Sequence, residues 1–277
     1  MKLNIYVYLL VSVFLSAYST MNKEEPTSEG APNVLFIPVD DLKPMLSCYG
    51  DSLVKTPNID RIAKRGTVFL NTACQQAICG PSRASLLTGM YPDQTKVWDL
   101  TTKMRDINPD ILTIPQYFKQ QGYTTTGIGK TFDPRCVDNG KFMDKPSWSI
   151  PYQKAKSIQY ANPEVKVAWG KAEKLIEGQT FDVAYKRNRA IAQAGILMAR
   201  PSTECMDVPD DIYSDGANTK VALDLMEKLA QSENPFFLSV GYAKPHLPFI
   251  APKKYWDLYD RSSIPLAPFQ QKSENGP

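Results

Sequence analysis

The chain alternates between continuous apolar runs and segments in which apolar residues recur at helical spacing. Residues 33–39 (NVLFIPV) and 235–242 (PFFLSVGY) lack the polar alternation of a half-exposed strand, so we expect strands that are covered on both faces. A third strand is predicted over 123–129, and a further extended segment over 67–73. Helices are predicted at 57–65, 82–90, 113–121 and 217–230. This order indicates an α/β sandwich, with a mostly parallel central sheet and helices on both faces.

Charged and polar residues follow directly after the three predicted strands. These residues are Asp40, Asp41, Lys130, Lys244 and His246. In open parallel sheets, ligands bind beyond the carboxyl ends of the strands, which all lie at one edge. We therefore expect these scattered residues to form a single site.

Residues 134–212 are less periodic and more polar than the rest of the chain, with helix-like stretches only over 171–200. We interpret 134–212 as an insertion that carries substrate contacts or packs over the sheet. Its aromatic residues Tyr152, Tyr160 and Trp169 could stack on a sugar, although packing is their commoner role. Its basic residues could attract a polyanionic glycan or form a solvated helix face, and they are Lys171, Lys174, Lys186, Arg187 and Arg189.

The N-terminus has the pattern of a secretory signal peptide. Lys2 precedes a short apolar run over residues 5–17. Small residues lie at the end of this run and just after it, at Ala17 and Ser19. The run is short for a membrane span, and an uncleaved anchor is the alternative. We predict a signal peptide over 1–19, a flexible leader over 20–32, no stable membrane span, and a secreted or periplasmic protein.

Composition excludes several classes of function. The 277 residues carry a net charge of +3, from 32 basic and 29 acidic residues, which gives no case for nucleic-acid binding. Five cysteines are too few for a disulfide scaffold. The single histidine excludes a histidine-rich zinc site within this chain.

Asp40 and Asp41 are adjacent carboxylates at the end of an apolar strand. Two such charges repel each other, so burying them requires a cation or a raised pKa. Because the chain has almost no histidine, oxygen ligands point to calcium or magnesium as that cation. The alternative is a solvated turn after the strand.

Cys79 lies just before a proline-initiated helix, in the segment Cys79-Gly80-Pro81-Ser82-Arg83, and Arg83 lies one turn into that helix. The helix N-terminus and Arg83 would both favour negative charge near the cysteine, so a plain thiol there would have a lowered pKa and could act as a nucleophile. The alternative is a buried cysteine that packs like a small apolar residue.

The segment 79–83 matches the C-x-P-S-R motif of the sulfatase family, and the following Leu-Leu-Thr-Gly extends the match. Segments 33–41, 56–60, 129–130 and 244–246 also resemble that family. Within it, other segments are similar to the sulfatases that act on uronate 2-sulfates, at 41–44, 48–51, 114–118, 235–238 and 241–249. The resemblance runs from about Asn33 to Pro268 and is thinnest between 134 and 205, which implies that 33–277 is the N-terminal portion of a sulfatase catalytic domain.

The resemblance implies an alkaline-phosphatase-like sandwich and a sulfated sugar or glycosaminoglycan-type substrate. Cys79 would be oxidised to formylglycine by a maturation enzyme, and the hydrate would attack sulfur and then release sulfate. Asp40, Asp41 and the modified Cys79 would bind Ca²⁺, with Mg²⁺ possible. Arg83 would hold the hydrate, and Lys130 and His246 would contact the sulfate ester. A phosphate or phosphonate ester hydrolase, and an inactive glycan-binding fragment, are the alternatives.

The sequence departs from the family at two places. Relatives usually carry a histidine where this chain has Asp133, which would be protonated, turned away or paired with a lysine. Sulfatases also supply further calcium ligands and a lysine after the last predicted strand, and we find no such segment before Pro277. We therefore expect a fragment, a remainder on a separate polypeptide, or a degraded relative. Calcium affinity should be poor, because this ion takes roughly six to eight oxygen ligands.

Overall fold

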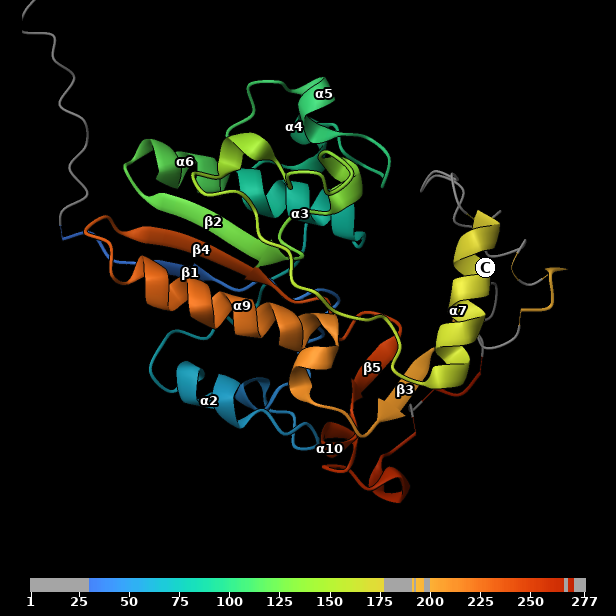
Figure 1. The fold of residues 1–277 in the computed structure, drawn as a ribbon. Helices are drawn as coiled ribbons and strands as arrows, with labels where there is room; N and C mark the ends of the chain where they lie inside the picture. Colours follow the sequence, from blue (N-terminus) through green and yellow to red (C-terminus); the bar gives the residue numbers. More distant parts are fainter. Residues whose placement is uncertain (1–29, 177–190, 192, 197–199, 267–268, 272–277) are drawn as a thin grey trace, which may run out of the picture.

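The central sheet is parallel and has three strands in the order β1–β4–β2 (Figure 1). The computed structural model describes residues 30–176, 191, 193–196, 200–266 and 269–271, so the predicted signal peptide lies outside the described residues. The strands are β1 (Val34–Phe36), β2 (Thr124–Gly129) and β4 (Phe236–Gly241). β4 pairs in parallel with both neighbours, so the last of the three strands in sequence lies at the centre.

Helices cover both faces of this sheet, which confirms the predicted α/β sandwich (Figure 1). On one face, the ring of Phe237 in β4 stacks on Phe118 of α6 (Ile114–Gln120), with 5.0 Å between ring centroids. On the other face, Leu238 and Ile128 pack against α9 (Ser214–Leu229). The other α-helices with described bounds are α2 (Pro57–Ala63), α3 (Cys79–Thr88), α4 (Pro92–Thr95), α5 (Met104–Ile107), α7 (Pro163–Ile176) and α10 (Lys253–Trp256). Short 3-10 helices lie at Ser47–Tyr49, Pro134–Cys136, Lys145–Ser147, Asp210–Ile212 and Arg261–Ser263.

Two expectations about strands are wrong. All six residues of β4 are buried as predicted, but in the segment 33–39 Leu35 and Ile37 are 43% and 45% exposed. The reason is that, among the described residues, β1 pairs with a strand on one side only. The segment 67–73 forms bends and irregular structure, and its side chains Phe69 and Leu70 are exposed. An apolar run therefore becomes a covered strand only where neighbours flank it on both sides.

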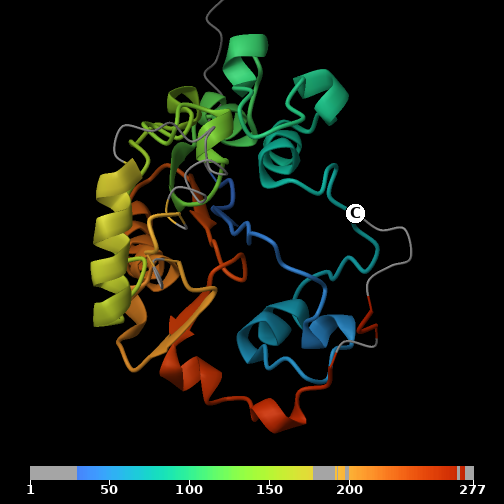
Figure 2. The ribbon, with the colours of Figure 1, turned by 90° about the vertical axis from the view of Figure 1, so that its right-hand side faces the viewer.

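The region 134–212 contributes α7 and the strand β3 (Thr203–Met206), which pairs in parallel with β5 (Phe249–Pro252). Both views show α7 at one margin of the molecule (Figures 1 and 2). Tyr160 is buried against Trp169, so these rings pack, and Tyr152 donates a hydrogen bond to the carbonyl of Gly129 at 2.9 Å. α7 begins at Pro163, before residue 171, where the sequence predicts the helix-like stretches to start. The basic residues Lys186, Arg187 and Arg189 lie outside the described residues.

No helix within the described ranges combines the length and apolar character that crossing a membrane requires.

Two glycines face each other where the sheet ends. Gly129 of β2 pairs with Gly241 of β4, and the chain then continues into Lys130 on one side and Tyr242 on the other. A Cβ on Gly129 would collide with the carbonyl oxygen of Gly241, and Gly129 also has a φ of +78°. This close approach requires glycine and fixes the direction in which Lys130 leaves the sheet.

We expect Gly129→Ala to lower the free energy of unfolding by about 1–3 kcal/mol, because the backbone must shift to accommodate the new methyl group. Gly170→Ala in α7 is the matched control, since a Cβ there meets no atom within 4 Å. Alanine favours a helix interior, so this control should gain about 0.5–1 kcal/mol. Urea unfolding of both variants would measure the difference, and equal stabilities would contradict the role of the glycine pair.

Candidate active site

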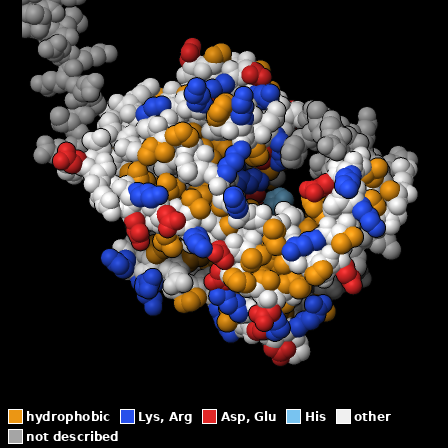
Figure 3. Space-filling view, viewed as in Figure 1, with side chains coloured by type: hydrophobic (Ala, Val, Ile, Leu, Met, Phe, Trp, Pro, Cys, Tyr) orange, Lys and Arg blue, Asp and Glu red, His pale blue; other side chains and the backbone are white. Residues whose placement is uncertain are grey.

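A cleft of about 570 Å³ opens at the carboxyl end of the sheet. The cleft brings together five predicted site residues from separate parts of the chain, namely Asp40, Asp41, Cys79, Arg83 and His246. Lys130, the remaining predicted residue, reaches the same place through an ion pair with Asp40. In the space-filling view, Lys and Arg side chains gather beside a hollow that has the histidine at its rim (Figure 3). The structure therefore places these six residues close together, whereas Lys244, also expected in this site, lines a different cavity.

Asp40 is buried and paired with two cations. Its Oδ1 accepts hydrogen bonds from Arg83 at 2.9 Å (Nη2) and 3.3 Å (Nε), and its Oδ2 lies 2.5 Å from Nζ of Lys130. Burial raises the pKa of Asp40, but Lys130 and Arg83 more than offset it, so the pKa lies below its ordinary value. The carboxylate is thus ionised at neutral pH and links three segments of the chain.

Arg83 is the buried partner of Asp40. Its Nη1 donates to the carbonyl oxygens of Lys130 and Thr131, the second at 2.8 Å, while Nε and Nη2 donate to Asp40. The guanidinium therefore holds α3 against the end of β2. All of its hydrogen bonds within the described residues go to Asp40 and to main-chain oxygens.

Cys79 is the first residue of α3 and is half-buried. Its Sγ donates to Oδ2 of Asp133 at 3.0 Å and accepts from Nη2 of Arg135 at 3.2 Å. Burial and the neighbouring Asp133 raise the pKa of the Cys79 thiol. The expected lowering is wrong, because Arg83 turns to Asp40 and an anion lies beside the sulfur instead.

Asp133 points at Cys79 and is paired with an arginine. Nε and Nη2 of Arg135 donate to its two oxygens at 2.9 and 2.8 Å, and Nζ of Lys130 lies 3.8 Å away. Burial raises the pKa of Asp133, but Arg135, Cys79 and Lys130 outweigh it and lower the pKa to about 2. Of the three states considered from the sequence, Asp133 is neither protonated nor turned away, and its main partner is Arg135.

The described residues do not make a complete metal site. Both oxygens of Asp40 already bind cationic side chains, whereas Asp41 is exposed and has a φ of 59°. The described part of the chain contains no group of three or more His, Cys, Asp or Glu residues placed to hold a metal. Calcium takes roughly six to eight oxygen ligands, so Asp40, Asp41 and Cys79 alone do not fit it.

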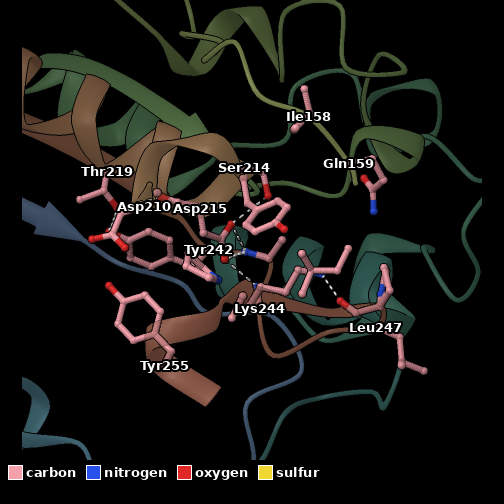
Figure 4. A pocket seen from close by; sticks show the side chains of 17 residues that line it. Ile158, Gln159, Asp210, Ser214, Asp215, Thr219, Tyr242, Lys244, Leu247 and Tyr255 are labelled. Carbon is pink, nitrogen blue, oxygen red and sulfur yellow. Dashed lines mark hydrogen bonds between the residues drawn. The ribbon is translucent and has the colours of Figure 1, made fainter. Parts of the chain in front are cut away.

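The loop that carries His246 is anchored by Asp215, a residue that the sequence did not single out for this role. Asp215 accepts hydrogen bonds from the backbone N–H groups of Ala243 at 3.0 Å and Lys244 at 2.8 Å (Figure 4). Nδ1 of His246 lies 2.7 Å from the carbonyl oxygen of Leu247. Because a carbonyl only accepts, Nδ1 carries the proton, and Nε2 is left for another partner.

Lys244 is used inside the same loop. Its Nζ donates to the carbonyls of His246 at 2.9 Å and Pro248 at 2.7 Å. Burial lowers the pKa of Lys244. A second cavity of about 460 Å³ lies beside the loop, lined among others by Asp215, Tyr242 and Leu247 (Figure 4). Asp215 thus holds the backbone of the loop that leads to His246.

Known proteins resemble this chain over most of its length. A sequence model of the sulfatase family matches residues 32–271. Human iduronate 2-sulfatase is 38% identical over 264 residues, which are 95% of this chain and 44% of the relative. Mouse iduronate 2-sulfatase is 41% identical over 238 residues, which are 86% of this chain and 39% of the relative. The chain therefore spans less than half the length of these curated relatives.

The fold also matches solved structures. The phosphonate monoester hydrolase of Agrobacterium radiobacter superposes with a TM-score of 0.53 at 22% identity, covering 85% of this chain and 45% of that one. This likeness supports the sandwich architecture alone.

Proposed function

Because the chain belongs to the sulfatase family, we propose that it hydrolyses sulfate esters of sugars, with a uronate 2-sulfate at a glycan end as its substrate. The observation that carries this proposal is the cleft in which Cys79 lies together with Asp40 and His246. The identity of 38% to human iduronate 2-sulfatase supports the choice of sugar. A glycosaminoglycan-type chain would be the source of such a sugar.

Formylglycine made from Cys79 would supply the hydroxyl that attacks sulfur. The position fits this group, because Asp133 and Arg135 already offer an acceptor and a donor to the atom at the tip of residue 79. Lys130 would stabilise the negative charge that develops on the sulfate. Asp40 holds the ammonium group of Lys130 in place, with 2.5 Å between Nζ and Oδ2. His246 presents Nε2, which would take the proton of the attacking hydroxyl and pass it to the departing sugar alcohol.

Sulfatases generally use a divalent metal ion, and Asp40 and Asp41 are the acidic side chains of this cleft that could contribute to one. The described residues do not complete the coordination of such an ion. Arg83 and Lys130 both pair with Asp40.

We also propose an extracytoplasmic site of action, which rests on the sequence of residues 1–19. A formylglycine-generating enzyme would be the maturation partner. The region 33–277 would form the N-terminal portion of the catalytic domain, with 134–212 as its insertion.

Maturation can be tested by the mass of the tryptic peptide 66–83, which holds Cys79, from protein made in its own host. We expect the aldehyde mass at Cys79, because the motif and its position at the start of α3 are intact. Cys74 lies in the same peptide and serves as the internal control, with an unmodified thiol expected. An unmodified Cys79, in a host shown to mature other sulfatases, would favour the inactive glycan-binding fragment.

Side-by-side rates on an aryl sulfate and an aryl phosphate would test the reaction class. We expect the sulfate ester to react faster. The ion pairs of the site carry one net positive charge, from three cationic side chains and two carboxylates, and this charge suits a singly charged sulfate ester better than a doubly charged phosphate ester. Faster hydrolysis of the phosphate would instead support a phosphate or phosphonate ester hydrolase on this scaffold.

A further inference from the structure

Arg135 is a cation in direct contact with the proposed nucleophile position. Its Nη2 lies 3.2 Å from Sγ of Cys79, although the two residues are 56 positions apart. The residue lies in the short 3-10 helix Pro134–Cys136, which follows the end of β2. Its side chain is 26% exposed and is paired with Asp133, so it is held at the site and can still be reached from solvent.

Asp133 fixes the orientation of this guanidinium. Nε and Nη2 of Arg135 bind Oδ1 and Oδ2 of Asp133 in a two-pronged contact, at 2.9 and 2.8 Å. The backbone N–H of Arg135 also donates to Oδ1, at 3.1 Å. A fork-to-carboxylate contact of this kind sets both the position and the plane of the guanidinium. No acceptor among the described residues engages Nη1, so this group is available to a ligand.

The other cations that touch this cluster are already engaged. Arg83 gives its hydrogen bonds to Asp40 and to main-chain oxygens, and Nζ of Lys130 lies 2.5 Å from Asp40. The buried cluster has one more cation than carboxylate, since Arg83, Lys130 and Arg135 face Asp40 and Asp133. Of these three cations, Arg135 is the one that both contacts Sγ of Cys79 and keeps N–H groups, those of Nη1, that no described residue accepts.

We propose that Arg135 binds the sulfate group of the substrate beside Cys79, and that Asp133 is the residue that positions it. The proposal rests on the proposed function for the identity of the substrate. The two N–H groups of Nη1 would donate to sulfate oxygens, while Nε and Nη2 stay bound to Asp133 and Cys79. A planar guanidinium can do both at once, whereas an ammonium group cannot. Asp133, being ionised and paired, neither donates nor accepts a proton in this scheme.

The competing explanation is that the Asp133–Arg135 pair only stabilises the loop after β2. Inorganic sulfate, bound by protein that retains an unmodified Cys79, separates the two explanations without requiring catalysis. The variants are Arg135→Gln, Arg135→Lys, Asp133→Asn and the double change Asp133→Asn/Arg135→Gln. Arg61→Gln, at an exposed arginine of α2, is the matched control. Ionic strength is held constant with sodium chloride, because salt screens such contacts.

We expect Arg135→Gln to weaken sulfate binding by roughly 10- to 100-fold, the effect of losing a hydrogen bond to a charged group. Arg135→Lys should recover part of the affinity, because it keeps the charge but loses the fork. Asp133→Asn should weaken binding less than Arg135→Gln does. The double variant should bind no worse than Arg135→Gln, since Asp133 acts through Arg135. It also removes both charges, so no unpaired buried ion remains to unfold the protein.

Turnover of an aryl sulfate by matured protein supplies the second measurement. A substrate contact predicts a higher KM for Arg135→Gln together with a lower kcat, whereas a purely structural role would reduce the amount of active protein at unchanged KM. If matured wild type turns over and Arg135→Gln has the wild-type KM and sulfate affinity, the proposal for Arg135 is overturned and the proposed function stands. If wild type binds sulfate without turnover, the proposed function fails, and the binding series still decides the role of Arg135. Wild type that does neither overturns both.

Discussion

Replacing Cys79 with alanine is expected to abolish sulfate release from a uronate 2-sulfate, by on the order of 10⁴-fold or more, which is typical of the loss of a catalytic nucleophile. The substitution removes the only atom from which formylglycine could be made at this position. The surrounding cations would still bind the ester. We therefore expect kcat to fall far more than KM rises, as measured by release of inorganic sulfate.

Cys205→Ala is the matched control for this loss. Cys205 lies in β3, carries an exposed free thiol and belongs to no part of the cleft, so wild-type activity is expected. Thermal unfolding should distinguish lost chemistry from lost structure, because Cys79 is only half-buried and its removal breaks the hydrogen bonds to Asp133 and Arg135. Wild-type release by Cys79→Ala would refute the proposed mechanism.

The largest loss of stability is expected for Asp40→Asn. The amide keeps the shape of the carboxylate but leaves Arg83, with a side chain only 6% exposed, and Lys130 without their anion. Removing one partner of a buried ion pair costs about 3–5 kcal/mol, because the remaining charge is neither hydrated nor paired. Urea unfolding followed by tryptophan fluorescence would measure the change in the free energy of unfolding.

The adjacent Asp41→Asn provides the control for charge removal at this turn. Asp41 is exposed, so its substitution should change stability by no more than about 0.5 kcal/mol. If the two variants unfold at the same urea concentration, Asp40 does not link the three segments as the structure indicates.

The position of the site was predictable because parallel strands bring their carboxyl ends to one edge. Asp40, Lys130 and His246 each follow a strand that the apolar pattern indicates, and the structure places them around one cleft. Cys79 was identifiable from its motif. Its contacts were not, because the direction of the Arg83 side chain depends on which carboxylate it reaches, and Asp40 is 43 positions away.

The parts that the sequence did not predict depend on contacts between distant segments. Arg135 lies two residues beyond Asp133, and only the bend after β2 turns both side chains back toward Cys79. β3 and β5 are four residues each, and β3 (Thr203–Met206) contains no continuous apolar run, so little in the sequence indicates that they pair. In the sequence, Asp215 is an ordinary acidic residue in the first turn of a helix. Its contact with the backbone of the loop after β4 is visible only in the folded chain.

The position of β4 has a consequence for biosynthesis. Asn33 and Phe236, whose side chain and backbone are joined by a hydrogen bond, are 203 residues apart. A ribosome that adds about 5–20 residues per second needs about 10–40 s to make the intervening chain. In the later part of that interval, after Gly129 has been added, β1 and β2 have both been synthesised but the strand that must lie between them has not. The three-stranded sheet, and the cleft that His246 lines at its carboxyl end, can therefore form only after these last segments have been synthesised.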